Sequence, residues 1–219
     1  MAQTITGNNG ANQLNSGGGV DTLIGLNGSD VYFVRALRTI ITETAGQGAV
    51  DIVRSSVGFG LSVGSDIEQM STTLNTGTVA INLTGNAIVQ AITGNDGANR
   101  LDGRGGADKL IGLGGTDTFV FSPALAVTNV DTITDYSVAD DMIELKSSIF
   151  TGLANGALIA NAFAINATGV AGDATYRIIY QSETGFLFFD ADGAGGAAGV
   201  KIAVLTAGLA MVATEFVVA

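Results

Sequence analysis

The sequence lacks cysteine, histidine and tryptophan, and Pro123 is the only proline among its 219 residues. Without cysteine and histidine the chain cannot form disulfide bridges, zinc-finger sites, Ser-His-Asp triads, Cys-His pairs or HExxH zinc helices. Any metal must therefore be held by oxygen atoms. That donor set favours a hard cation such as calcium over zinc or copper.

Basic residues are also scarce, with 9 Lys and Arg against 20 Asp and Glu and a net charge of −11. An acidic chain repels phosphate, so nucleic acid is not an expected partner. No apolar run approaches the ~20 residues of a membrane span, and the N-terminal segment lacks the basic and apolar regions of a Sec signal peptide. The 32 glycines show no G-X-Y period, which excludes collagen and implies a local use for them.

Two segments resemble each other, and within each the period is nine residues. The first begins at Ile5 and is ITGNNGANQLNSGGGVDTLIGLNGSDVYFV; the second begins at Ile92 and is ITGNDGANRLDGRGGADKLIGLGGTDTFVF. In every unit a glycine is followed two residues later by an acid or amide, and an apolar residue comes two residues after that. The acid or amide positions are Asn12, Asp21, Asp30, Asn99, Asp108 and Asp117. A shared register over both segments indicates a repeat architecture.

Each unit predicts a glycine-rich turn of six residues followed by a strand of three. The apolar residue points inward because strand side chains alternate, and one unit cannot bury that face alone, so the units must stack as a solenoid. Stacking aligns the turn acids in a column whose charges repel unless a cation lies between them. We expect calcium, which accepts carboxylate and backbone carbonyl oxygens. The alternative is ordinary Asx-turn chemistry, in which Asp and Asn bond the local backbone.

The repeat resembles the GGxGxDxUx nonapeptide of the RTX (repeats-in-toxin) calcium-binding family. Four acids match the motif, whereas Asn12 and Asn99 depart from it and should bind more weakly. In the family two nonapeptides make one coil of a parallel β-roll. The resemblance therefore implies that Asn12 pairs with Asp30 and Asn99 with Asp117, while Asp21 and Asp108 lie on the opposite edge. The implied metal ligands are Asn12, Asp21, Asp30, Asn99, Gly103, Gly105, Asp108, Gly112, Gly114, Asp117, Asp131 and Asp135.

The resemblance extends beyond the repeats. The segment DTITDYSVADDMIEL from Asp131 is similar to the one that follows the rolls in serralysin-type C-terminal domains, which implies that Asp131 and Asp135 complete a site with Asp108. A degenerate unit ending in Gln90 extends the second array. In the spacer, Glu43 is a candidate partner for Asp21. Whether metal binds at Glu43, Asp51, Asp190 or Asp192 stays open, and Asp140, Asp141 and Glu144 are expected on a solvated face.

The predicted fold class is all-β, with two short parallel β-roll segments, a strand-rich spacer and a C-terminal β-rich cap. The expected domains are a first roll at 1–34, a spacer at 35–82, a second roll at 83–122 and a cap with a secretion signal at 123–219. Within the cap, 177–180 and 186–189 predict a hairpin around Glu183-Thr-Gly, and a helix is considered near 154–162. The terminal EFVVA resembles the ending of type I secretion substrates.

These observations favour a secreted calcium-binding protein that folds in extracellular calcium and has a structural role at the cell surface or in a matrix, with self-assembly as a candidate property. The partners would be calcium, the type I secretion machinery, a second copy of the chain or a cell-surface polysaccharide. Two alternatives stay open: the secretion cassette of an enzyme, and a carbohydrate-binding adhesion module. We expect no enzymatic activity, because the turn carboxylates that catalysis would need are assigned to metal. We also expect no attached catalytic domain.

Overall fold

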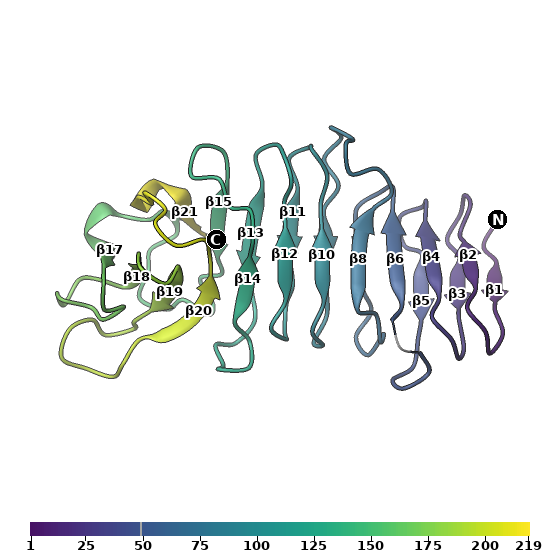
Figure 1. The fold of residues 1–219 in the computed structure, drawn as a ribbon, viewed down its shortest axis with the longest axis horizontal. Coiled ribbons are helices and arrows are strands. Elements are labelled where there is room, and N and C mark those ends of the chain that lie inside the picture. Colours follow the sequence, from purple (N-terminus) through teal and green to yellow (C-terminus); the bar gives the residue numbers. More distant parts are fainter. Residues whose placement is uncertain (49) are drawn as a thin grey trace.

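Short strands alternate with turns along an elongated β-solenoid (Figure 1), as the nine-residue period predicts. The computed structural model describes residues 1–48 and 50–219. In the first array, strands of three or four residues are separated by turns at residues 16–21 and 25–30. The N-terminus lies at one end of the solenoid and the cap at the other (Figure 1). The fold is the predicted all-β parallel solenoid.

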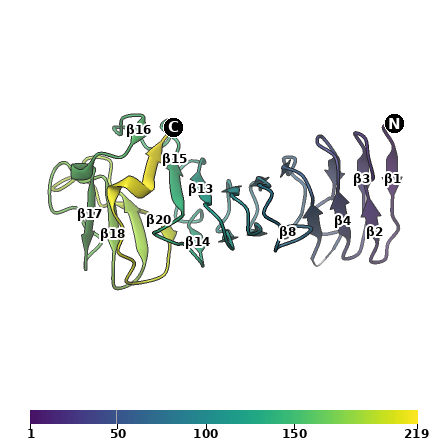
Figure 2. The same ribbon diagram turned by 90° about the horizontal axis from the view of Figure 1, so that it is seen from above.

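Successive strands of the arrays alternate between two faces, which are seen from two directions in Figures 1 and 2. One face is an 11-stranded sheet in the order β17 (Phe163–Asn166), β18 (Ile178–Gln181), β19 (Phe186–Phe189), β20 (Val200–Val204), β14 (Asp131–Ile133), β12 (Lys109–Ile111), β10 (Ala91–Thr93), β8 (Gln69–Thr72), β6 (Ile52–Ser55), β4 (Val31–Val34) and β2 (Gln13–Asn15). The other face has a three-stranded sheet of β1 (Thr4–Thr6), β3 (Thr22–Ile24) and β5 (Ile40–Thr42). It continues in a seven-stranded sheet of β16 (Gly156–Ala157), β21 (Phe216–Val218), β15 (Met142–Leu145), β13 (Thr118–Phe121), β11 (Arg100–Asp102), β9 (Leu83–Thr84) and β7 (Phe59–Gly60).

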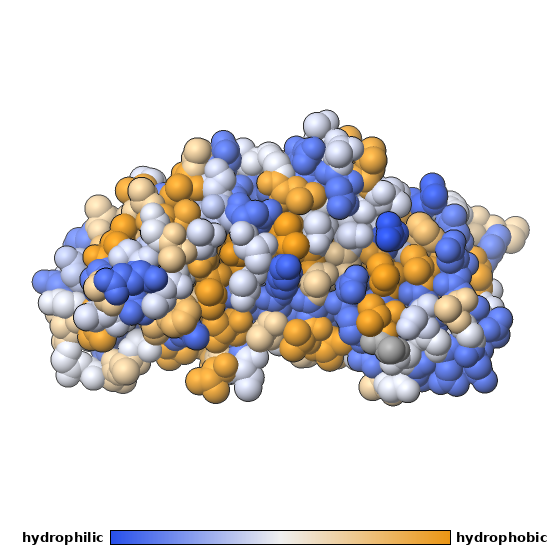
Figure 3. Space-filling model, in the orientation of Figure 1, coloured by the Kyte–Doolittle hydropathy of each residue, from blue (hydrophilic) through white to orange (hydrophobic). Residues whose placement is uncertain are grey.

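The core consists of the apolar residues that the repeat places inside. Every one of these positions is buried, with exposed fractions of 3% or less, at Leu14, Leu23, Tyr32, Leu101, Leu110 and Phe119. They stack in line because strands one coil apart are parallel and in register, as where Leu101 lies opposite Phe119. On the surface, hydrophobic residues lie in separate groups among hydrophilic ones on the face shown in Figure 3.

Glycine is required where adjacent coils approach most closely. Gly106 has a φ of 102°, and a Cβ added to it would lie 2.6 Å from the Ile88 carbonyl oxygen of the preceding coil. Gly115, nine residues later, has the same φ and a similar approach to the Gly97 backbone. Any other residue here would be strained and would separate the coils.

The spacer continues the solenoid between the two arrays. Strand β6 pairs in parallel with β4 of the first array and with β8, and β8 pairs with β10 of the second array. Coils within the arrays are 18 residues long, as in the hydrogen bond from Asn12 to Asp30. Spacer coils differ, since the equivalent bonds from Asp30 to Asp51 and from Asp51 to Glu68 span 21 and 17 residues.

The cap covers the C-terminal end of the solenoid (Figure 1). The predicted hairpin is confirmed, because β18 and β19 pair antiparallel. The helix considered near 154–162 is wrong: this stretch contains strand β16 and a 3₁₀ turn, η1, at Ala160–Ala162. A second such turn, η2, occupies Ala213–Glu215. In the described residues, no helix has the length and apolar character needed to span a membrane.

Candidate metal sites along the solenoid edges

One edge of the solenoid carries a continuous column of polar side chains. Each member lies at the start of a strand of the 11-stranded sheet, either directly before it or, for Asp131, as its first residue, and the register of those strands places the members one coil apart. This first column consists of Asn12, Asp30, Asp51, Glu68, Gln90, Asp108 and Asp131. The column therefore runs from the first array through the spacer to the second array without a break.

Five of the six adjacent pairs in the first column are joined by hydrogen bonds from a backbone N–H to a side-chain carboxylate. The Asn12 N–H donates to Asp30 Oδ1 at 2.7 Å, and the Asp30 N–H donates to Asp51 Oδ1 at 2.6 Å. In the second array the Gln90 N–H donates to Asp108 Oδ1 at 2.7 Å. One oxygen of each of these carboxylates is thus used to hold the preceding coil.

A second column lies on the opposite edge. The Asn99 N–H donates to Asp117 Oδ1 at 2.8 Å, and the Asp117 N–H donates to Asp141 Oδ1 at 2.9 Å. On the N-terminal three-stranded sheet, Asp21 Oδ1 accepts the Gln3 N–H at 2.8 Å. The structure therefore brings together the predicted pairs Asn12–Asp30 and Asn99–Asp117. Within each array the remaining acid lies on the opposite edge from the pair: Asp21 in the first array and Asp108 in the second. Metal binding at these residues stays a prediction.

The second carboxylate oxygen of several turns is buried without a hydrogen-bond partner. This holds for the Oδ2 atoms of Asp30, Asp108 and Asp117. Each lies against the first glycine of its own turn, since a Cβ added to Gly103 or Gly112 would lie 2.2 Å from the Oδ2 of Asp108 or Asp117. Leaving a buried anionic oxygen unpaired is costly. An oxygen-ligated cation such as calcium would satisfy these atoms.

The predicted glycine ligands line the same turns. A Cβ added to Gly85 would lie 2.6 Å from the Gly103 carbonyl oxygen, and one added to Gly94 would lie 2.8 Å from that of Gly112. These two carbonyls therefore point from their turns toward the preceding coil. Gly105 and Gly114 lie against Ala87 and Asp96 of that coil. Together with the unpaired Oδ2 atoms, the Gly103 and Gly112 carbonyls form an oxygen donor set that fits calcium.

Turns that end in an amide close on themselves instead. The Asn8 N–H donates to Asn12 Oδ1 at 2.6 Å, and the Asn95 N–H donates to Asn99 Oδ1 at 2.7 Å. The Gln90 Oε1 atom accepts from the Asn86 N–H in the same way, at 3.1 Å. The amide oxygen occupies the position against the first glycine where an Asp turn has its unpaired oxygen. These turns therefore satisfy their own polar atoms.

The backbone separates the two kinds of turn as well. In all four Asp-ended turns of the arrays the second residue is left-handed, with φ between 58° and 73°, at Gly17, Leu26, Arg104 and Leu113. The corresponding residues of the amide-ended turns are not left-handed. A left-handed Leu or Arg is strained. A bound cation would compensate that strain in the Asp turns.

Two sequence-based placements of acids are wrong. Asp135 does not lie with Asp108; it accepts the N–H groups of Gly112 and Leu113 at the turn that ends in Asp117. The reason is that strand β14 begins at Asp131 and carries the chain to the opposite edge before Asp135 is reached. Asp131 does lie beside Asp108, whose N–H donates to its Oδ1 at 3.0 Å.

Glu43 is likewise not near Asp21, because strand β5 separates it from Thr39, the residue aligned with Asp21. Its carboxylate lies with Asp30 and Asp51 instead.

The solvated face expected for three further acids is also wrong in part. Asp140 is exposed, but Asp141 is buried and belongs to the second column. Glu144 forms ion pairs with Arg100 at 2.8 Å and Lys146 at 2.6 Å. The sequence around these acids does not show which of them is buried. Parallel pairing of β13 with β15 decides it.

Elsewhere, Asp190 accepts the N–H groups of Asp192 and Gly193, which is Asx-turn geometry.

Burial raises the pKa of the column acids. The pKa of Asp108 rises from 3.8 to about 8 through desolvation and the neighbouring Asp131 charge. Desolvation likewise raises the pKa of Asp117 to about 7, with added repulsion from Asp141 and Asp135, and that of Asp131 to about 7. In the calcium-free protein these acids therefore hold protons in a pH range where exposed acids have lost them.

We expect the calcium-free protein to lose stability as the pH rises from about 4 to about 8. Over this window the folded chain binds more protons than the unfolded chain, because the pKa values of Asp108, Asp117 and Asp131 are raised, so the free energy of unfolding falls with pH. Calcium requires ionised ligands, so its affinity should rise with pH. The folded fraction, given by far-ultraviolet circular dichroism in chelator at pH 5 and pH 8, measures the first effect, and calcium titration at the two pH values measures the second. A calcium-free protein more stable at pH 8 would contradict the assignment.

Two segments of the chain, residues 2–32 and 90–120, match the family model of the RTX calcium-binding nonapeptide repeat (4 copies). Among the curated proteins none matches the chain. The matched segments contain the six turns whose acids and amides the period aligned, whereas Glu43, Asp51 and Glu68 lie outside them. The repeats together with the parallel β-solenoid fit an RTX β-roll protein.

Proposed function

We propose that this chain, an RTX-type calcium-binding protein, is a secreted protein that folds when its turns bind extracellular calcium and then has a structural role at the cell surface or in a matrix. The observation that supports this is the pair of carboxylate columns whose buried oxygens lack partners on opposite edges of one solenoid. Such a chain gains folding free energy from calcium binding, because the ligand set is absent from the unfolded state.

Calcium concentration would then decide where the chain folds. Extracellular calcium modules bind at about 10⁻⁴–10⁻³ M, so their sites stay empty in a cell interior that is low in calcium. In that state the aligned carboxylates repel one another and the coils do not stack. A loosely structured chain is suited to export through the type I machinery, and calcium outside the cell would complete folding.

The position of the C-terminal segment supports this coupling. Phe216 and Val218 of β21 are buried, and β21 pairs in parallel with β15. Glu215 is buried too, and its Oε1 accepts the Val212 N–H at 3.0 Å. A secretion signal in this segment is inaccessible in the folded protein, so an exporter would have to recognise it before calcium-dependent folding.

Hydrogen exchange at the C-terminus tests the coupling. We expect amides of residues 216–218 to exchange rapidly in chelator and to be protected at millimolar calcium, because their partner strand β15 follows directly on the second column. Mass spectrometry of the terminal peptide gives the rates, and magnesium at the same concentration is the control. Equal protection with and without calcium would sink the proposal that folding hides the signal.

We further propose that the role is structural and not catalytic. The column carboxylates accept hydrogen bonds from backbone N–H groups of neighbouring coils. These bonds hold the coils together, which supports a structural role for the carboxylates. Strands β1 and β2 are edge strands of their sheets. They support the proposal of self-assembly, because an unpaired edge is a template for pairing with another chain.

A further inference from the structure

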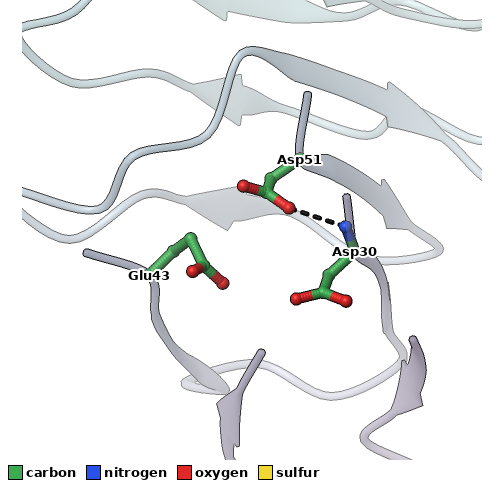
Figure 4. Close-up of side chains that lie close together, drawn as sticks. All are labelled: Asp30, Glu43 and Asp51. Carbon is green, nitrogen blue, oxygen red and sulfur yellow. Dashed lines mark hydrogen bonds between the residues drawn. The ribbon is translucent and has the colours of Figure 1, made fainter. Parts of the chain in front are cut away.

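Three buried carboxylates meet where the first array joins the spacer. Asp30 ends the last turn of the first array, Asp51 occupies the next position of the first column, and Glu43 follows β5. A carboxylate oxygen from each lies within 4.8 Å of the other two, and Figure 4 shows the three carboxyl groups directed toward a common space. Their exposed fractions are 0%, 3% and 2% for Asp30, Glu43 and Asp51.

Hydrogen bonds leave part of this cluster unsatisfied. Asp51 Oδ1 accepts the Asp30 N–H, and the Tyr32 hydroxyl donates to Glu43 Oε2. Asp30 Oδ2 and Glu43 Oε1 are buried and have no partner among the described residues. Among the described residues, the ion pairs join Glu144 to Arg100 and to Lys146. None of the three clustered acids takes part in one. Two unpaired anionic oxygens are therefore buried together without a counter-charge.

These oxygens pack directly against Gly25. A Cβ added to Gly25 would lie 2.2 Å from Asp30 Oδ2 and 2.5 Å from Glu43 Oε2, and it would also clash with the Tyr32 hydroxyl. Glycine at residue 25 therefore allows the three side chains to converge there. Burial raises the pKa of Glu43 to about 7, with further repulsion from Asp51 and Asp30. The negative charges of the neighbouring Glu68 and Asp66 likewise help to raise the pKa of Asp51, chiefly raised by burial.

We propose that Asp30, Glu43 and Asp51 bind a calcium ion that joins the first array to the spacer. All the donors are oxygen atoms, which hard cations prefer, and three carboxylates can neutralise the charge of one divalent cation. Asp30 belongs to the nonapeptide array, but Glu43 and Asp51 lie outside the segments that match the repeat. The site extends the proposed calcium-dependent folding, on which it rests, into the spacer.

Calcium at this position would link strands from both faces of the solenoid. Glu43 follows β5 of the three-stranded sheet, whereas Asp30 and Asp51 precede β4 and β6 of the 11-stranded sheet. The ion therefore connects residues of one edge that come from three successive strands of the chain. The coil at this junction has 21 residues instead of 18. Strand pairing of β3 with β5 places Glu43 18 residues after Gly25, so the extra residues lie between Glu43 and Asp51.

Calcium titration of Glu43→Gln tests the site. The variant keeps a side chain of the same size and an acceptor for Tyr32 while removing the charge. We expect it to bind one calcium ion fewer than the wild-type chain, or to bind one ion about tenfold or more weakly, in isothermal titration at pH 7.5. Glu183→Gln, the same change on an exposed turn of the cap, should titrate as the wild type.

Terbium luminescence gives a local readout, because the Tyr32 hydroxyl contacts Glu43 and can sensitise an ion bound there. Wild-type emission excited through tyrosine should fall in Glu43→Gln and in Tyr32→Phe, and Tyr32→Phe should keep the calcium stoichiometry. If Glu43→Gln binds calcium with wild-type stoichiometry and affinity, the junction site is overturned while calcium-dependent folding stands. If the wild-type chain binds no calcium, both proposals fail.

Discussion

Removing calcium should unfold most of this chain. A site with a dissociation constant near 10⁻⁴ M stabilises the folded state by about 2.7 kcal/mol when the free calcium concentration is about a hundred times that dissociation constant. Four Asp-ended turns, at Asp21, Asp30, Asp108 and Asp117, would together supply about 10 kcal/mol, which is comparable to the whole stability of a typical domain, roughly 5–15 kcal/mol. Two further features destabilise the calcium-free fold: the buried oxygens that lack hydrogen-bond partners, and the strained left-handed backbone of Leu26, Arg104 and Leu113.

Far-ultraviolet circular dichroism during a calcium titration measures this effect. We expect a disordered spectrum in chelator and a cooperative gain of β-structure near millimolar calcium, with magnesium much less effective because it demands stricter octahedral geometry. Light scattering in the same series distinguishes a folded monomer from an assembly of copies. A spectrum that is fully β-structured in chelator would exclude coupled folding, and a monomer at all calcium concentrations would remove the support for self-assembly.

Changing Asp108 or Asp117 should give the largest effect of any single substitution on calcium binding. Asp108→Ala and Asp117→Ala each remove an unpaired oxygen and the acceptor for a backbone N–H, from Gln90 and Asn99 respectively. We expect calcium affinity to fall roughly 10–100-fold or more for each variant. Asp173→Ala is the matched control, because Asp173 is exposed and accepts only from Thr175 of its own turn.

Asparagine variants separate the ligand role from the structural one. Asp108→Asn and Asp117→Asn keep a carbonyl oxygen that can accept the backbone N–H, but they remove the carboxylate charge. Ionising that carboxyl group is unfavourable in the calcium-free protein, because burial raises its pKa. They should therefore stabilise the calcium-free protein at pH 8 while weakening calcium binding. The folded fraction in chelator, measured by far-ultraviolet circular dichroism, and calcium titration give the two quantities. Equal calcium affinities for these variants, Asp173→Ala and the wild type would show that the turn carboxylates are not the ligands.

The concentration of acids along the sequence predicts only part of the calcium dependence. Nine of the twenty acids lie between Asp96 and Glu144, which points to the second array and the strands after it. That segment does hold Asp108, Asp117, Asp131 and Asp141 in the two columns. The junction of the first array with the spacer nevertheless gathers Asp30, Glu43 and Asp51 as closely, because coil stacking unites acids that are far apart in sequence.

The nine-residue period by itself determined the local structure of the arrays. A glycine-rich turn and an alternating strand leave one inward position per unit, and the burial of Leu23 and Leu110 follows from that alternation. The period does not say how many units complete one coil; the resemblance to RTX repeats implied two. With 18 residues per coil, that resemblance implied the pairs Asn12–Asp30 and Asn99–Asp117.

Only the tertiary structure decided which acids outside the arrays enter the columns. Coils there have 17, 21, 23 or 24 residues between equivalent positions, so counting gives no register. Strand pairing sets it instead: β4 with β6 aligns Asp30 with Asp51, and β13 with β15 aligns Asp117 with Asp141. Parallel strands align whatever the length of the turn between them. Asp141 is therefore a buried member of the second column. Glu43 lies with Asp30 and Asp51 on the edge opposite Asp21.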